Sequence, residues 1–92
     1  MKEAVSIAKL AKERIVVIAG EFNILGSDEL LKEMEEKLKQ GVPEEIYVYN
    51  PIPQGKRITK LHSLGAKIFL TKENPKDHYF VADDNILARI AI

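Results

Sequence analysis

The run of residues 14–21, Arg-Ile-Val-Val-Ile-Ala-Gly-Glu, constrains the fold of this chain more than any other stretch. It contains four consecutive β-branched residues, at positions 15–18, with no polar side chain between them. A segment that is apolar at every position is typical of a strand covered on both faces, usually at the centre of a parallel sheet. The sequence therefore predicts a central strand here, with all four β-branched residues almost fully buried.

Composition narrows the class of protein. A chain of 92 residues is the size of one domain, so we expect a single domain spanning residues 1–92. Fourteen basic and fourteen acidic side chains give no net charge, and nucleic-acid binding is therefore not indicated. The absence of cysteine excludes disulfides, thiolate metal sites and a cysteine nucleophile, and two histidines argue against a histidine-rich metal site. No cofactor is predicted.

The sequence also bears on location. No stretch approaches the roughly 20 apolar residues that a membrane-spanning helix needs. The N-terminus carries an acidic residue and no long apolar core, so it does not resemble a secretory signal, and we expect a cytoplasmic protein. Charged residues, mostly Lys and Glu, make up 30% of the chain, a bias common in proteins of hyperthermophiles.

Helical and extended patterns alternate along the chain. Small residues on one face of the first segment, Ala4, Ala8 and Ala11, predict a helix that lies close to a sheet. The predicted order is helix 2–13, strand 14–21, a helix starting at Ser27 and ending at Gly41, strand 45–50, a proline-stiffened loop 50–57, a short helix from Ile58 ending at Gly65, strand 66–71, strand 78–82 and strand 86–92.

This order predicts an α/β fold with a mixed, mostly parallel sheet of about five strands flanked by helices. Right-handed crossovers make the first three strands parallel. The last two strands form a β-hairpin around a turn at Asp83, Asp84 and Asn85, which we prefer to a metal site because the spacing is not that of a calcium loop.

Two stretches of the last third resemble a known family. Residues 64–70 (Leu-Gly-Ala-Lys-Ile-Phe-Leu) resemble the entry into the strand before the active-site segment of the phospholipase D superfamily, and residues 76–83 resemble its HxKxxxxD signature. The order α-β-α-β-α-β-β-β is similar to one half of a phospholipase D fold. An unrelated Rossmann-like arrangement is the alternative fold.

The signature itself departs from the family pattern. Aligned on Asp83, the position of the nucleophilic histidine holds Lys76, and the position of the phosphate-binding lysine holds His78. The Gly-Ser that follows the motif would fall at Ile90 and Ala91. In active members two histidines from two motifs face each other, and a single-motif chain supplies the second by dimerising. A lysine is protonated near neutral pH and is a poor nucleophile.

The resemblance thus implies a phospholipase D-like binding or assembly module without catalysis, acting as a homodimer. Two alternatives stay open. The first is a divergent phosphodiesterase whose composite site forms in the homodimer, and the second is a small sensor domain that binds a phosphorylated ligand.

Five residues are candidates for binding an anionic or phosphate-containing ligand. Lys76 and His78 lie two apart on one strand entry. Lys56 and Arg57 follow Gly55 at the start of a helix, where backbone N–H groups favour phosphate. Asn50 follows the second parallel strand, and ligands of open α/β sheets bind at such carboxyl ends. Asn23 holds the equivalent position after the first strand.

The last strand is the reason to expect a homodimer. Residues 86–92 are apolar on both faces, and Arg89 is the only charged residue among them. A strand of this kind lacks the proline or lysines that protect an exposed sheet edge. We therefore expect it inside the sheet or covered by a twofold-related partner.

Overall fold

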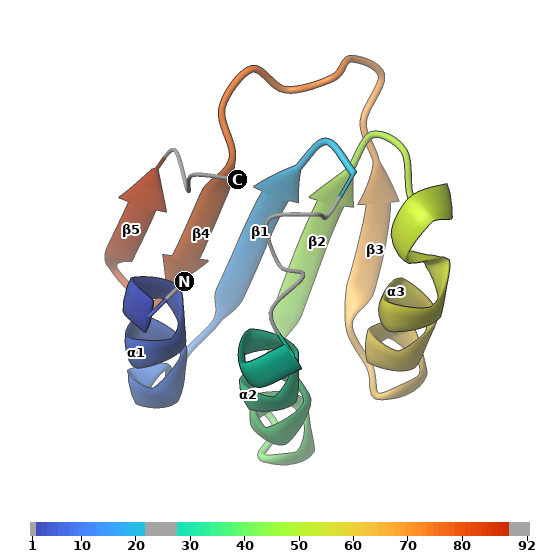
Figure 1. Cartoon of the computed structure of the whole chain (residues 1–92). Helices are drawn as coiled ribbons and strands as arrows, with labels where there is room; N and C mark the ends of the chain where they lie inside the picture. Colours follow the sequence, from blue (N-terminus) through green and yellow to red (C-terminus); the bar gives the residue numbers. More distant parts are fainter. Residues whose placement is uncertain (1, 22–27, 89–92) are drawn as a thin grey trace.

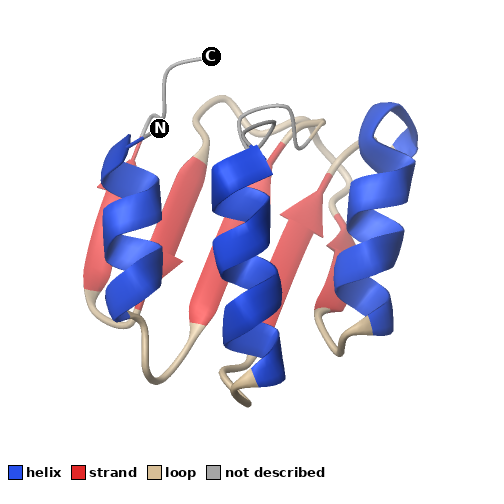
Figure 2. Cartoon of the chain, turned by 60° about the horizontal axis from the view of Figure 1, so that its bottom comes forward, coloured by secondary structure: helices blue, strands red, loops and turns tan. Residues whose placement is uncertain are grey.

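The three α-helices of the described residues lie on one face of a mixed sheet (Figures 1 and 2). The computed structural model describes residues 2–21 and 28–88. Helices α1 (Lys2–Leu10), α2 (Asp28–Lys39) and α3 (Gly55–Ser63) form one layer, and the strands form the other. The α/β class expected from the sequence is confirmed.

The sheet has the order β3-β2-β1-β4-β5. Strands β1 (Ile15–Ala19), β2 (Glu44–Val48) and β3 (Lys67–Leu70) are parallel to one another, as predicted. Strand β4 (Tyr79–Ala82) is antiparallel to β1, and β5 (Asn85–Ala88) continues the sheet antiparallel to β4. The central position of β1 is therefore confirmed, with a parallel neighbour on one side and an antiparallel neighbour on the other.

The one-sided helix layer follows from this order. From β1 to β2 to β3 the chain always steps toward the same edge, so right-handed crossovers place α2 and α3 on the same face. A doubly wound Rossmann arrangement has helices on both faces. The described helices, all on one face, do not have that arrangement (Figure 2).

The prediction that residues 15–18 are all buried is wrong. Ile15 and Val17 have 0% exposure, whereas Val16 and Ile18 are only half-buried. Successive side chains of a strand point to opposite faces, and the described helices cover only one of them. We call the side with α1, α2 and α3 the helix face and the opposite side the open face.

The core lies between the helices and the helix face. Helix α1 packs through small residues, as predicted, but it ends at Leu10 rather than residue 13, and Leu10 is 69% exposed. None of the described helices is long and apolar enough to cross a membrane. The largest buried apolar side chains are Phe80, Ile15, Leu30, Met34, Ile46, Leu61, Val17 and Val48.

The loop predicted at residues 50–57 is shorter than expected. A short 3-10 helix, η2 (Ile52–Gln54), follows Pro51, and α3 begins directly after it at Gly55. Proline fixes a φ close to the helical value and is therefore well suited to a first helical turn. Gly41 and Gly65 have φ of 88° and 112°, the left-handed conformation in which glycine commonly ends a helix, in agreement with the helix ends predicted at these two residues.

The predicted hairpin at the end of the chain is confirmed. Ala82 pairs with Asn85, so Asp83 and Asp84 form the turn, and Asp83 has a φ of 55°. Strand β5 is paired on one side with β4 and forms an edge of the sheet in the single chain. The remainder of the predicted last strand, residues 89–92, lies outside the described residues, as do Asn23 and Ser27.

Candidate functional site

The segments that follow β2 and β3 both approach Gly20, the residue directly after the carboxyl end of β1. The Gly20 carbonyl accepts hydrogen bonds from the backbone N–H groups of Tyr49 (3.0 Å) and Asn50 (2.8 Å). A methyl group at position 20 would lie 2.5 Å from Oδ1 of Asn74, in the loop before β4. A side chain at position 20 would therefore require the Asn74 side chain to move.

His78 contacts the same glycine through its ring. The backbone N–H of Gly20 donates a long hydrogen bond, 3.4 Å, to Nδ1 of His78. A neutral imidazole has one protonated nitrogen and one acceptor. Since Nδ1 accepts here, the neutral ring carries its proton on Nε2.

Asn50 and His78 are thus brought together, one on the carbonyl and one on the N–H of Gly20. The Asn50 side chain is already engaged, because its Oδ1 accepts the backbone N–H of Ile52 at 3.2 Å. Its first role is therefore to shape the turn into η2. Lys76 is exposed in the segment between β3 and β4, two residues before His78.

Lys56 and Arg57 occupy the first turn of α3. A guanidinium nitrogen of Arg57 lies 3.0 Å from a carboxylate oxygen of Asp28, the first residue of α2, and this ion pair ties the two helices together. Lys56 is exposed beside a shallow hollow formed by residues 52–57. The structure therefore separates the two cations: Arg57 bridges helices, while Lys56 faces solvent.

Asp83 closes the turn between α1 and β1. Its carboxylate accepts backbone N–H groups of Glu13 (2.7 Å), Lys12 (3.0 Å) and Arg14 (3.1 Å). These hydrogen bonds, first that of Glu13 and then that of Lys12, lower the pKa of Asp83. The third position of the family-like signature is thus a structural clamp from the hairpin onto the start of the central strand.

Glu44, at the start of β2, is the one buried charged side chain among the described residues. It is 1% exposed on the helix face, and neither carboxylate oxygen has a hydrogen-bond partner among the described atoms. Burial raises its pKa from 4.5 to about 8. Sequence analysis missed this residue, although alternation from Ile46 and Val48 places Glu44 on the buried face.

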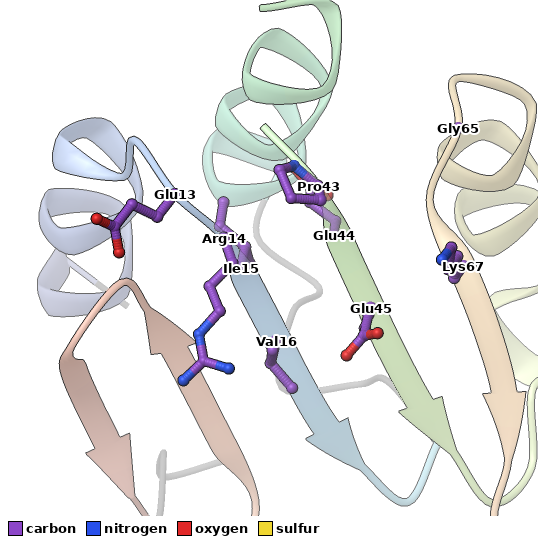
Figure 3. A pocket seen from close by; sticks show the side chains of 9 residues that line it. All are labelled: Glu13, Arg14, Ile15, Val16, Pro43, Glu44, Glu45, Gly65 and Lys67. Carbon is purple, nitrogen blue, oxygen red and sulfur yellow. The ribbon is translucent and has the colours of Figure 1, made fainter. Parts of the chain in front are cut away.

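The amino ends of the parallel strands form a pocket of about 330 Å³ (Figure 3). Its charged lining includes Arg14, Glu45 and Lys67, and Val16 contributes an apolar wall. These four side chains belong to the open face by strand alternation, so the pocket is continuous with that face. The candidates for ligand binding lie at the other end of the strands.

The open face itself was not foreseen. Strand register puts two rows of side chains across it. One row is Phe69, Tyr47, Ile18 and Tyr79, and the other is Lys67, Glu45, Val16 and Val81. The rings of Tyr47 and Phe69 stack with centroids 4.9 Å apart, and Phe69 is 40% exposed.

Within residues 2–21 and 28–88, no group of three or more His, Asp or Glu side chains is placed to hold a metal ion. In comparisons with known proteins, no family model, no curated protein and no solved structure matches the chain.

Proposed function

We propose that this chain is a non-catalytic module, similar to half of a phospholipase D fold, that acts by binding and by assembling as a homodimer. One observation carries the proposal: the orientation of His78, which directs Nδ1 at the Gly20 N–H. A histidine that attacks phosphorus needs a free lone pair on the attacking nitrogen. In the neutral ring described above, Nε2 carries a proton and has no lone pair to offer.

The same orientation suits binding. The Nε2–H group is a hydrogen-bond donor, and the ammonium group of Lys76 two residues earlier is a cation with no partner among the described contacts. A donor and a cation at the carboxyl edge of a parallel sheet fit a phosphate-containing ligand. Asp83, the third signature residue, is occupied by backbone amides and supports the hairpin instead.

Hydrolysis is the first test. The purified protein should not turn over bis(4-nitrophenyl) phosphate, because neither Lys76 nor His78 is an available nucleophile. Turnover that disappears in His78→Ala would overturn the proposal and favour the divergent phosphodiesterase with a site formed in the dimer.

Binding is the second test. Titration with inorganic phosphate, followed by amide NMR, should shift the signals of Lys76 and His78. His78→Asn is the matched control. The asparagine oxygen can still accept a hydrogen bond from the Gly20 N–H, whereas the Nε2–H donor is lost. If the wild type responds and His78→Asn does not, the imidazole contacts the ligand. Equal responses would remove His78 from the site.

A small sensor domain is the remaining alternative. It requires that a phosphorylated ligand changes the assembly state. Sedimentation with and without phosphate distinguishes a sensor, whose dimerisation changes when phosphate is added, from a module whose dimerisation does not change.

A further inference from the structure

We infer that the open face of the sheet is the surface through which two copies of this chain pair. The inference rests on the proposed assembly function and names the surface and the partner. The pairing places the row of Phe69, Tyr47 and Ile18 at the centre of a twofold interface. Strand β5 is not required for it.

The side-chain composition of the open face favours a protein partner. Three of its eight described side chains are aromatic, Tyr47, Phe69 and Tyr79, and three are aliphatic. Aromatic residues are enriched at the centres of protein interfaces, where they bury large areas with little loss of side-chain freedom. On the helix face the equivalent positions of β1, β2 and β4 are buried beneath the helices, although Leu70 of β3 is 70% exposed. None of the described helices covers the open face (Figure 2).

The charges of the open face favour a second copy of this chain as the partner. The open face carries both signs: Lys67 and Glu45 are cross-strand neighbours, and the exposed Arg14 lies at the amino end of β1. Figure 3 shows Arg14 and Glu45 on either side of Val16. Nucleic acid requires a surface of positive charge, and a strongly acidic or basic partner requires the opposite single sign. In a twofold interface the same patch is on both sides, so the charges that it carries must include both signs to be complementary.

The area of the open face is large enough for a weak homodimer. Four strands spaced about 4.8 Å apart, each about 16 Å long, present a face of roughly 300 Å² in projection. With the relief of the side chains, pairing buries on the order of 500–700 Å² per copy, close to the lower limit of about 600 Å² per copy (about 1,200 Å² in total) for a standard interface. The expected dimer is therefore weak, with a dissociation constant on the order of 10–100 µM.

The test uses charges placed at Ile18, which is half-buried at the centre of the open face. Ile18→Lys and Ile18→Glu should each sediment as monomers at about 500 µM, where the wild type is mostly dimer. An equimolar mixture of the two variants should recover the dimer, because opposite charges then face each other. Recovery also shows that both variants are folded.

The matched control is Thr59→Lys. Thr59 is exposed on α3, on the other side of the molecule, so the same charge there should leave the dimer intact. If Ile18→Lys remains a dimer, or if the mixture stays monomeric, the open face is not the pairing surface. The proposed assembly would then use another surface.

The hydrolysis assay on the same samples keeps the two proposals apart. A wild type that is monomeric at about 500 µM contradicts pairing by the open face and the assembly function together. Hydrolysis of bis(4-nitrophenyl) phosphate by a confirmed dimer would overturn the absence of catalysis and leave the interface standing.

Discussion

Val16 and Val17 are neighbours of the same residue type on the same strand, and they have different environments. Val17 has no exposed surface and packs beneath the helices, whereas Val16 is half-buried on the open face. A continuous apolar run therefore does not imply a continuous core. It can also mean that one face folds the chain and the other is kept apolar for a partner.

The same contrast holds one strand away. Glu44 and Glu45 are adjacent in β2, but Glu44 is buried on the helix face without a hydrogen-bond partner. Glu45 lies on the open face and accepts a hydrogen bond from the hydroxyl group of Tyr47 at 3.3 Å. The two faces thus differ in how they surround a carboxylate: burial on the helix face raises the pKa of Glu44, whereas the Glu45 carboxylate on the open face has a hydrogen-bond partner in Tyr47.

The largest predicted effect is the pH dependence that Glu44 gives to stability. Its pKa rises from 4.5 to about 8 on folding, so between these values the folded protein holds a proton that the unfolded chain releases. Stability therefore falls as the pH rises through this window, by at most about 1.4 kcal/mol per pH unit and by a few kcal/mol in total.

Denaturant unfolding from pH 5 to pH 9 measures this slope. Glu44→Gln removes the titrating group and should flatten the curve, while Glu45→Gln, the matched control on the open face, should leave it unchanged. A wild type whose stability does not fall between pH 5 and pH 8 would show that water or a neighbouring group forms hydrogen bonds with the Glu44 carboxylate.

The next effect compares the two valines. Val17→Ala should destabilise the fold by about 1–3 kcal/mol, because it removes buried methyl groups and leaves a small cavity. Val16→Ala should cost less than about 1 kcal/mol in dilute solution, because the open face is already hydrated. Chemical denaturation of both variants at about 1 µM, below the expected dissociation constant, gives the comparison. Equal costs would contradict the distinction between the faces.

Asp83 offers an acid-side test. Its pKa is lowered by the amides of Glu13, Lys12 and Arg14, so its contribution to stability is present above the unfolded value of 3.8 and lost as the pH falls below it. Asp83→Ala should lower the melting temperature and weaken this acid dependence. Asp83→Asn keeps one acceptor oxygen and a residue that tolerates the positive φ, so it should lie between the two. Identical melting at pH 6 for all three would show that the clamp contributes nothing.

The smallest effect is expected at Gly20. Gly20→Ala brings a methyl group against Asn74, but Asn74 is exposed and can move aside, so the cost should be below about 1 kcal/mol. Gly20→Ala with Asn74→Ala should restore wild-type stability. A large loss of stability that Asn74→Ala does not relieve would mean that other parts of these loops, and not only the Asn74 side chain, resist the added methyl group.

The element order, the parallel strands and the hairpin could be predicted because they depend on local patterns: alternating helical and extended periods, glycine at helix ends and a polar turn. The burial of Val16 and Ile18 could not, because the sequence does not say whether one or two helix layers cover a strand. The meeting of Asn50 and His78 at Gly20 depends on β4 returning beside β1, a pairing between positions about 60 residues apart. The sequence indicated that Asp83 is a turn residue. The three backbone amides that it binds could not be predicted, because they are brought to Asp83 by the same long-range pairing.

The most direct test of the two-faced sheet is amide NMR of the unmodified protein over a dilution series from about 1 mM to about 10 µM, which spans the dissociation constant expected for an interface of this size. If two copies pair through the open face, the concentration-dependent shifts cluster at Val16, Ile18, Tyr47, Phe69 and Tyr79, while the signals of α2 and α3 stay fixed. Shifts confined to the helices or to β5, or no shifts at all, would contradict it.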